Sequence, residues 1–220
     1  MMHRRLPSSS SGQLGGYDWR AAGWVAAGSV GAVVLLVFVV RDVLGWDFVL
    51  ATRAPLLARN IDPRYGGWLG NLGVLGWTLA TGITALGATV ARRRGDRSAA
   101  TYFAASSALS AVLLVDDSFL IHTAVAPGLF GVPKPAVILG IVVLGVAWVV
   151  AFSSRLLADP DLPMLVWSLG WYAMALLIDS FGGVFGWGEV REEMAKLIGV
   201  SSWLAFHWRG TLRIVAPADG

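Results

Sequence analysis

The chain has 220 residues, of which 56% are hydrophobic and only 14% are charged, whereas ordinary soluble domains carry about a quarter charged residues. It contains no cysteine, which excludes disulfide frameworks, thiolate nucleophiles and thiolate metal sites. The net charge of +3 comes from arginines at the ends of apolar blocks, where they orient membrane helices, so we expect no nucleic-acid partner.

The apolar residues form long blocks, each close to the ~20 residues that cross a ~30 Å hydrocarbon layer. We therefore predict an all-α, polytopic transmembrane helix bundle with about six spans, at residues 21–40, 69–91, 99–123, 135–152, 163–182 and 190–208. The third and sixth spans are the least apolar. Because polar side chains are costly against lipid, these two spans should face the interior of the bundle.

Three segments outside the spans are polar or mixed in composition. Residues 1–20 are rich in Ser and Gly and have too few apolar side chains to fold, which predicts a disordered cytoplasmic tail. Residues 209–220 are predicted to be a second cytoplasmic tail. Residues 42–68 mix aromatic and leucine side chains with arginines, which favours a short amphipathic helix along the membrane interface between spans one and two.

The cationic residues are distributed unevenly over this topology. The side with both termini holds ten lysines and arginines, four of them in the short loop 92–97, and the other side holds seven. Because short cytoplasmic loops concentrate Lys and Arg, we expect a multi-pass protein of the cytoplasmic (plasma) membrane with both termini in the cytoplasm.

Ionisable and amide side chains gather at the opposite, outer end of the spans. A charged side chain at a helix centre costs about 2.5 to 3.5 kcal/mol on insertion scales, so these groups should face the bundle interior, water or one another. The candidate polar site consists of Asn71, Asp116, Asp117, His122, Asp179, Glu189 and Glu193.

Helical geometry predicts which way the acids of the third span point. Asp117 shares an inward face with Ser106 and Ser110, and His122 lies on a neighbouring stripe. Asp116 lies about 100° from Asp117 around the helix. It should therefore contact a different helix, such as the second span.

On the sixth span, Glu192 and Lys196 have the i to i+4 order that favours an ion pair. The same span carries His207 near its cytoplasmic end, far from the outer cluster. A haem held by two histidines is therefore disfavoured, because His122 and His207 lie at opposite ends of the bundle.

A metal site is one interpretation of the outer cluster. Carboxylates with a single histidine suit Mg, Mn, Ca or iron better than zinc, which points to a divalent metal ion at Asp117, His122 and Asp179. No standard ligand motif supports this site, since the Glu-x-x-His spacing of di-iron bundles and the HExxH motif are both missing. The identity of any cofactor stays open.

Two short segments are similar to each other, ValAspAspSerPhe at 115–119 and LeuIleAspSerPhe at 177–181. If they reflect an internal repeat, spans two and three form a hairpin equivalent to spans four and five. Many transporters carry such repeats, with their sites between them. A match of three residues also arises by chance.

The chain also contains GlyAsnLeuGly-x-Leu-x-Trp at 70–77 and AspAsp-x-Phe-Leu-x-His at 116–122. Together these motifs resemble a pattern in small, multi-span bacterial integral membrane proteins of unknown function. In that pattern an acid follows the histidine, whereas this chain has Thr123, which weakens a metal site carried over from the resemblance. The resemblance implies a membrane fold and a bacterial source, and no activity.

Two functional hypotheses follow. The first is an outward-facing site, centred on Asp117, Asp179 and His122, that binds a cation or handles protons in an enzyme or carrier within the lipid bilayer. The alternative is a structural or partner-binding membrane subunit, in a homo-oligomer or with another protein, whose buried polar groups only stabilise helix packing. The sequence does not decide whether the protein is an enzyme.

Overall fold

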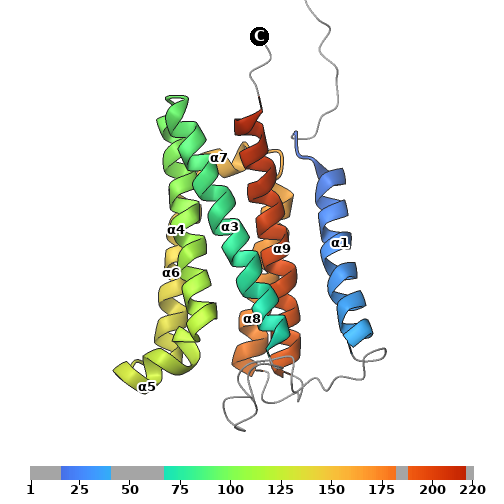
Figure 1. Ribbon diagram of the computed structural model, residues 1–220, viewed down its shortest axis with the longest axis vertical. Coiled ribbons are helices and arrows are strands. Elements are labelled where there is room, and N and C mark those ends of the chain that lie inside the picture. Colours follow the sequence, from blue (N-terminus) through green and yellow to red (C-terminus); the bar gives the residue numbers. More distant parts are fainter. Residues whose placement is uncertain (1–15, 41–66, 182–187, 217–220) are drawn as a thin grey trace, which may run out of the picture.

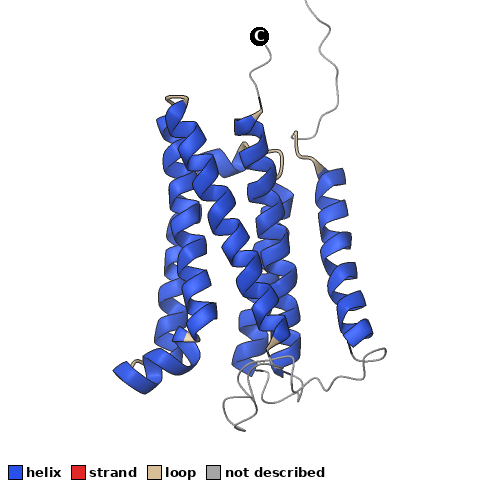
Figure 2. Cartoon of the chain, in the orientation of Figure 1, coloured by secondary structure: helices blue, strands red, loops and turns tan. Residues whose placement is uncertain are grey.

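A computed structural model describes residues 16–40, 67–181 and 188–216, in which every regular element is a helix (Figure 2). In chain order these are α1 (Trp19–Phe38), α3 (Trp68–Arg93), α4 (Arg97–Phe119), the π-helix η4 (Ile121–Val125), α5 (Ala126–Phe130), α6 (Lys134–Ala151), α7 (Ser153–Leu157), α8 (Leu162–Phe181) and α9 (Gly188–Val215). The predicted all-α class is confirmed. The predicted interfacial helix and most of the first tail lie outside the described residues.

Five helices, α1, α3, α4, α6 and α8, are long and apolar enough to cross a membrane, and they match the first five predicted spans. The sixth predicted span corresponds to α9, which is 28 residues long but too polar to qualify by composition. Its charged side chains lie towards its two ends. It runs alongside the other long helices (Figure 1). The described chain begins and ends at the same end of the bundle.

The interior of the bundle is built around α3 and α9. Helix α3 packs against both α4 and α9, and α8 packs along the other side of α9. Helix α1 stands at the edge of the bundle (Figure 1), where it contacts α9 and α8. The two most apolar helices, α1 and α6, are thus peripheral, as expected of helices that face lipid.

Buried serines on α4 fasten two tryptophan rings from other helices. Ser106 accepts a hydrogen bond from Trp148 Nε1 at 3.2 Å, and Ser110 accepts one from Trp203 Nε1 at 3.0 Å. Both serines are fully buried, which confirms the inward face predicted for the third span. Such hydroxyl groups join membrane helices without leaving a polar atom against lipid.

A group of ion pairs ties the helices together at the end where the described chain begins and ends. Asp161, fully buried before α8, accepts from Arg209 Nε at 2.9 Å and also pairs with Arg213. Asp18, which caps the first turn of α1, pairs with Arg209 Nη2 at 2.8 Å. We expected Arg209 and Arg213 to lie in the cytoplasmic tail 209–220. They belong instead to α9, which continues to Val215.

The two predicted hairpins are not equivalent in the structure. Helices α3 and α4 pack along their lengths, whereas α6 and α8 touch at few points and α8 packs against α9 instead. The similarity between residues 115–119 and 177–181 therefore does not reflect a repeated, packed hairpin.

Glycines on α3 allow its close approach to its neighbours, and one of them gives a direct test. A Cβ at Gly87 would lie 2.8 Å from the Phe103 ring and 3.0 Å from Thr211 Oγ1, whereas a Cβ at Gly82 meets nothing within 4 Å. We expect Gly87→Ala to lower the free energy of unfolding by about 1–3 kcal/mol through overpacking. The measurement is the thermal unfolding midpoint in detergent. Gly82→Ala, the matched control, should leave the midpoint unchanged or raise it, and an equal response of the two variants would contradict this packing.

Candidate functional site

A local reversal of the chain after α4 brings Asp116 and His122 together. Leu120 ends α4 with a φ of 52°, in the left-handed region that leucine rarely adopts, and the π-helix η4 follows directly. Asp116 Oδ1 accepts from the backbone N–H of His122 at 3.0 Å, and Asp116 Oδ2 lies 2.7 Å from His122 Nδ1. We expected Asp116 to contact the second span, but its carboxylate binds His122 because the left-handed residue interrupts the helical periodicity.

Lys196 on α9 gathers carboxylates from two helices. Its Nζ lies 2.7 Å from Glu193 Oε1, 3.2 Å from Glu192 Oε1 and 3.8 Å from Asp117 Oδ1. The predicted pair between Glu192 and Lys196 is confirmed. One ammonium group thus compensates three acids, in a part of the bundle where an uncompensated charge would be expensive.

Helix α3 reaches the same region through its glycine-rich first turns. A Cβ at Gly73 would lie 3.1 Å from Asp117 Oδ2, so the carboxylate lies close against the α3 backbone. One turn later, Trp77 stacks on Tyr172 of α8, with ring centroids 5.5 Å apart, and meets Trp203 of α9 edge-on at 6.2 Å. The motifs at 70–77 and 116–122 therefore meet in space.

Asp179 enters the region from α8 with a cation of its own. Its Oδ1 lies 2.5 Å from the Nζ of Lys134, at the start of α6. In the sequence Lys134 is only one of the cations that set the orientation of the spans. The pair could not be predicted because 45 residues separate its members.

These groups line one end of a cavity of about 460 Å³ inside the bundle. Most of the remaining wall is apolar and comes from α4, α6, α8 and α9. The hydroxyl of Tyr172, which also belongs to the wall, is buried and has no hydrogen-bond partner among the described residues. The charged and imidazole side chains of the wall are Asp116, Asp117, His122, Asp179, Glu192 and Lys196.

The cavity brings together much of the predicted site. Four of its residues, Asp116, Asp117, His122 and Asp179, line the wall. Glu193 joins the cluster through Lys196, whereas Asn71 is exposed on the first turn of α3 and does not line the wall. The side chain of Glu189 lies outside the described part of the chain. Glu192, Lys196 and Tyr172 are the additions made by the structure.

The candidate metal ligands are engaged by other protein groups. His122 is held by Asp116, and Asp179 by Lys134, so neither presents itself freely to Asp117. Within residues 16–40, 67–181 and 188–216, no three acidic or histidine side chains are arranged to hold a metal ion. A divalent metal ion at Asp117, His122 and Asp179 therefore stays a prediction from the sequence.

His207 lies apart from the cavity wall, as expected from its place on the sixth span. It is only 1% exposed, and its ring packs against Trp203 and Phe206 with centroids 4.6 and 5.0 Å away. Neither ring nitrogen has a hydrogen-bond partner in the described residues. The contacts identify His207 as part of the aromatic core.

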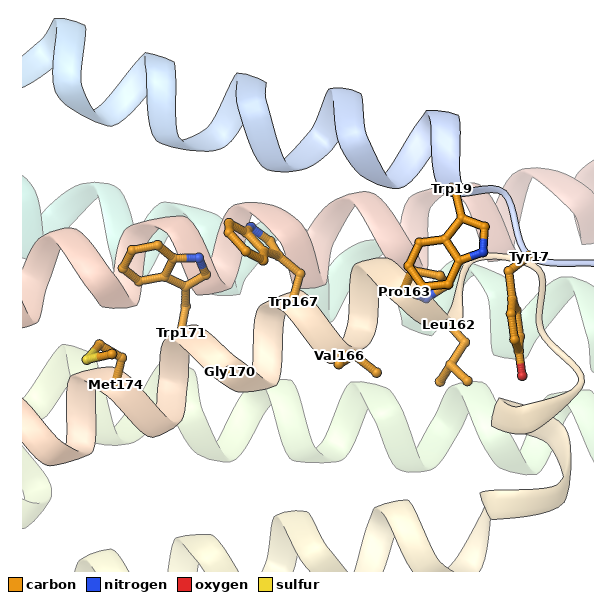
Figure 3. A pocket seen from close by; sticks show the side chains of 9 residues that line it. All are labelled: Tyr17, Trp19, Leu162, Pro163, Val166, Trp167, Gly170, Trp171 and Met174. Carbon is orange, nitrogen blue, oxygen red and sulfur yellow. The ribbon is translucent and has the colours of Figure 1, made fainter. Parts of the chain in front are cut away.

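A second hollow, of about 500 Å³, lies between the start of α1 and α8 (Figure 3). The rings of Trp19, Trp167 and Trp171 project into the space between these helices. Its lining includes no acidic, basic or histidine side chain. This hollow therefore offers no acid–base group.

Comparison with known proteins places the chain in a family without assigning an activity. The chain belongs to the family described as a domain of unknown function (DUF8692), whose model matches residues 26–209. The match includes every helix that lines the cavity. Searches of curated proteins and of solved structures gave no match.

Removing the shared cation tests the electrostatics of the cluster. We expect Lys196→Met to lower the free energy of unfolding by about 3–5 kcal/mol at neutral pH, because Asp117, Glu192 and Glu193 lose their common partner. The loss should shrink from about pH 8 to about pH 5, since the native variant relieves repulsion by binding protons. Thermal midpoints in detergent measure both effects. Arg191→Met, an exposed cation on the same helix, is the control, and an equal, pH-independent response would contradict the arrangement.

Proposed function

We propose that this member of a family of unknown function is an integral membrane protein that handles protons or another cation inside its helix bundle, as part of an enzyme or carrier. The observation that carries the proposal is the Asp116–His122 pair on the wall of a cavity shared with acids from α8 and α9. Ionisable groups inside a membrane domain are costly to keep and mark ion and proton routes.

The pair between Asp116 and His122 has the geometry needed to move a proton. The carboxylate of Asp116 accepts a hydrogen bond from the Nδ1–H of His122. In a neutral imidazole the proton is therefore on Nδ1, and Nε2 is left as an acceptor. Carboxylates orient the histidine of many acid–base sites in this way. The side chains of His122 and Asp116 remain 16% and 13% exposed, so that they are accessible from the cavity.

The charges around the pair favour a cation. Lys196 faces Asp117, Glu192 and Glu193 together, so its single positive charge leaves an excess of negative charge at this end of the cavity. Negative walls of low dielectric constant raise the local concentration of cations. A proton suits the Asp116–His122 pair better than a divalent ion does, because a metal site needs several ligands converging on one point.

The same proposal includes a location. We place the protein in a bacterial plasma membrane, with both termini in the cytoplasm and the charged end of the cavity in the outer half. The described chain begins and ends at one end of the bundle, together with the arginine-rich turn between α3 and α4, and short cytoplasmic loops concentrate such residues. The bacterial source rests on the resemblance of the two motifs.

The alternative, a structural or partner-binding subunit, requires the polar side chains to serve packing alone. The cavity beside these polar side chains is evidence against this alternative. Protein interiors are close-packed, and a polar network that only joins helices needs no empty volume next to it.

Infrared difference spectroscopy in lipid tests the proton-handling proposal. We expect Asp116→Asn to alter the carboxylic acid region of the spectrum relative to the wild type, because the pair with His122 is lost. His122→Gln should alter the same region. Asp96→Asn, which changes an exposed acid at the start of α4, is the control. Identical spectra for wild type, Asp116→Asn and His122→Gln would refute the proposal.

Metal analysis separates the proton from a divalent cation. If the cation is a proton, purified wild type, Asp117→Asn and Asp179→Asn should have the same metal content, because no metal ion is needed to balance these acids. A stoichiometric divalent metal in the wild type that is lost in either variant would instead support the metal site predicted from the sequence.

A further inference from the structure

The cavity continues from its charged end into a long apolar section. Its lining runs from Asp179 to Leu169 on α8 and from Ile138 to Val149 on α6, which corresponds to about 15 Å along each helix at 1.5 Å per residue. Beyond the charged end, the wall consists mainly of aliphatic and aromatic side chains. This shape has a charged head and a long apolar body.

The apolar section lies beside the membrane. Its walls include α6 and α8, two helices that touch at few points. Val142 and Val146 of α6 belong to the wall and are 37% and 56% exposed, on a helix with a mean hydropathy of 2.2. An exposed apolar wall between α6 and α8 is what a sideways route from the lipid into the cavity requires.

The charged end favours a cationic head group. Among the described residues, the cluster contains two lysines, Lys134 and Lys196. Its five acids outnumber these two cations, and they still do so when His122 is protonated. A positively charged head group would be compensated here, and an anionic one would be repelled. The acids are Asp116, Asp117, Asp179, Glu192 and Glu193.

Tyr172 of α8 also belongs to the wall of the cavity. Its hydroxyl is fully buried and is therefore not exposed to the cavity, and it has no hydrogen-bond partner in the described part of the chain. Its ring is fixed between Trp77, on which it stacks, and Gly199, whose added Cβ would lie 3.0 Å from Tyr172 Cζ.

We propose that the cavity binds a single-chain amphiphile from the bilayer, with a protonated amine at the charged end and its alkyl chain along α6 and α8. The inference rests on the proposed function for its charged end and names the class of molecule on which that end acts. The amine is held by the carboxylates, and its proton lies within the region served by Asp116 and His122.

Photolabelling of the full chain in lipid nanodiscs tests this inference. The probe is dodecylamine with a diazirine at the end of its alkyl chain. Intact-protein and peptide mass spectrometry should show saturable labelling on α6 or α8. Unlabelled dodecylamine should compete at a concentration about tenfold or more below that required for dodecanol or dodecanoate. Equal competition by all three chains would overturn the cationic head group.

A pair of glycines on α6 supplies a cavity-filling variant and its control. Gly145 lines the cavity, Gly140 does not, and an added Cβ at either position meets nothing within 4 Å. Gly145→Leu should reduce saturable labelling about tenfold or more, because its side chain occupies the space of the alkyl chain. Gly140→Leu should label like the wild type. Unchanged labelling of Gly145→Leu, with an unfolding midpoint equal to that of the control, would overturn the inference.

The two proposals fail separately. Amine-selective labelling that depends on residue 145, with a carboxyl band that Asp116→Asn leaves unchanged, would retain the amphiphile and reject proton handling. The opposite result is that Asp116→Asn alters the carboxyl band, but Gly145→Leu is labelled like the wild type. This result would retain proton handling and reject the amphiphile.

Discussion

A carboxylate inside a membrane domain needs a cation or hydrogen-bond donors at contact distance, and Lys196 meets this need for Asp117, Glu192 and Glu193 together. This requirement explains the position of α9. The helix is too polar to face lipid, so its acidic and basic side chains are stabilised only where other helices surround them. Helices α3 and α8 accordingly pack against it, and the two most apolar helices, α1 and α6, are left at the edge.

The same requirement leaves an internal space. Helix α8 packs closely on α9 and much less on α6, and a cavity of about 460 Å³ lies between α6, α8 and their neighbours. Charged groups of four elements converge at its polar end, and the rings of Trp77 and Trp203 also belong to its wall. The volume is thus a result of how the charges are compensated, and it lies where a ligand of mixed polarity fits.

Much of this arrangement was predictable, since the length and apolarity of a span are local properties. The inward face of α4 and the pair between Glu192 and Lys196 followed from the period of one helix. The pair between Lys134 and Asp179 did not, because it depends on how distant helices pack. The partner of Asp116 was also missed, because a left-handed leucine and a π-turn interrupt the period from which its direction was extrapolated.

That interruption also bears on the order of synthesis. Asp116 and His122 are six residues apart, so their contact can form as soon as the hairpin of α4 and α5 has left the ribosome. The contact between Asp117 and Lys196 joins residues far apart in the sequence and cannot form until α9 has been translated. Two adjacent aspartates therefore acquire these partners at different times. The imidazole pair thus forms as a local unit, whereas the ammonium group reaches its aspartate only after α9 has been translated.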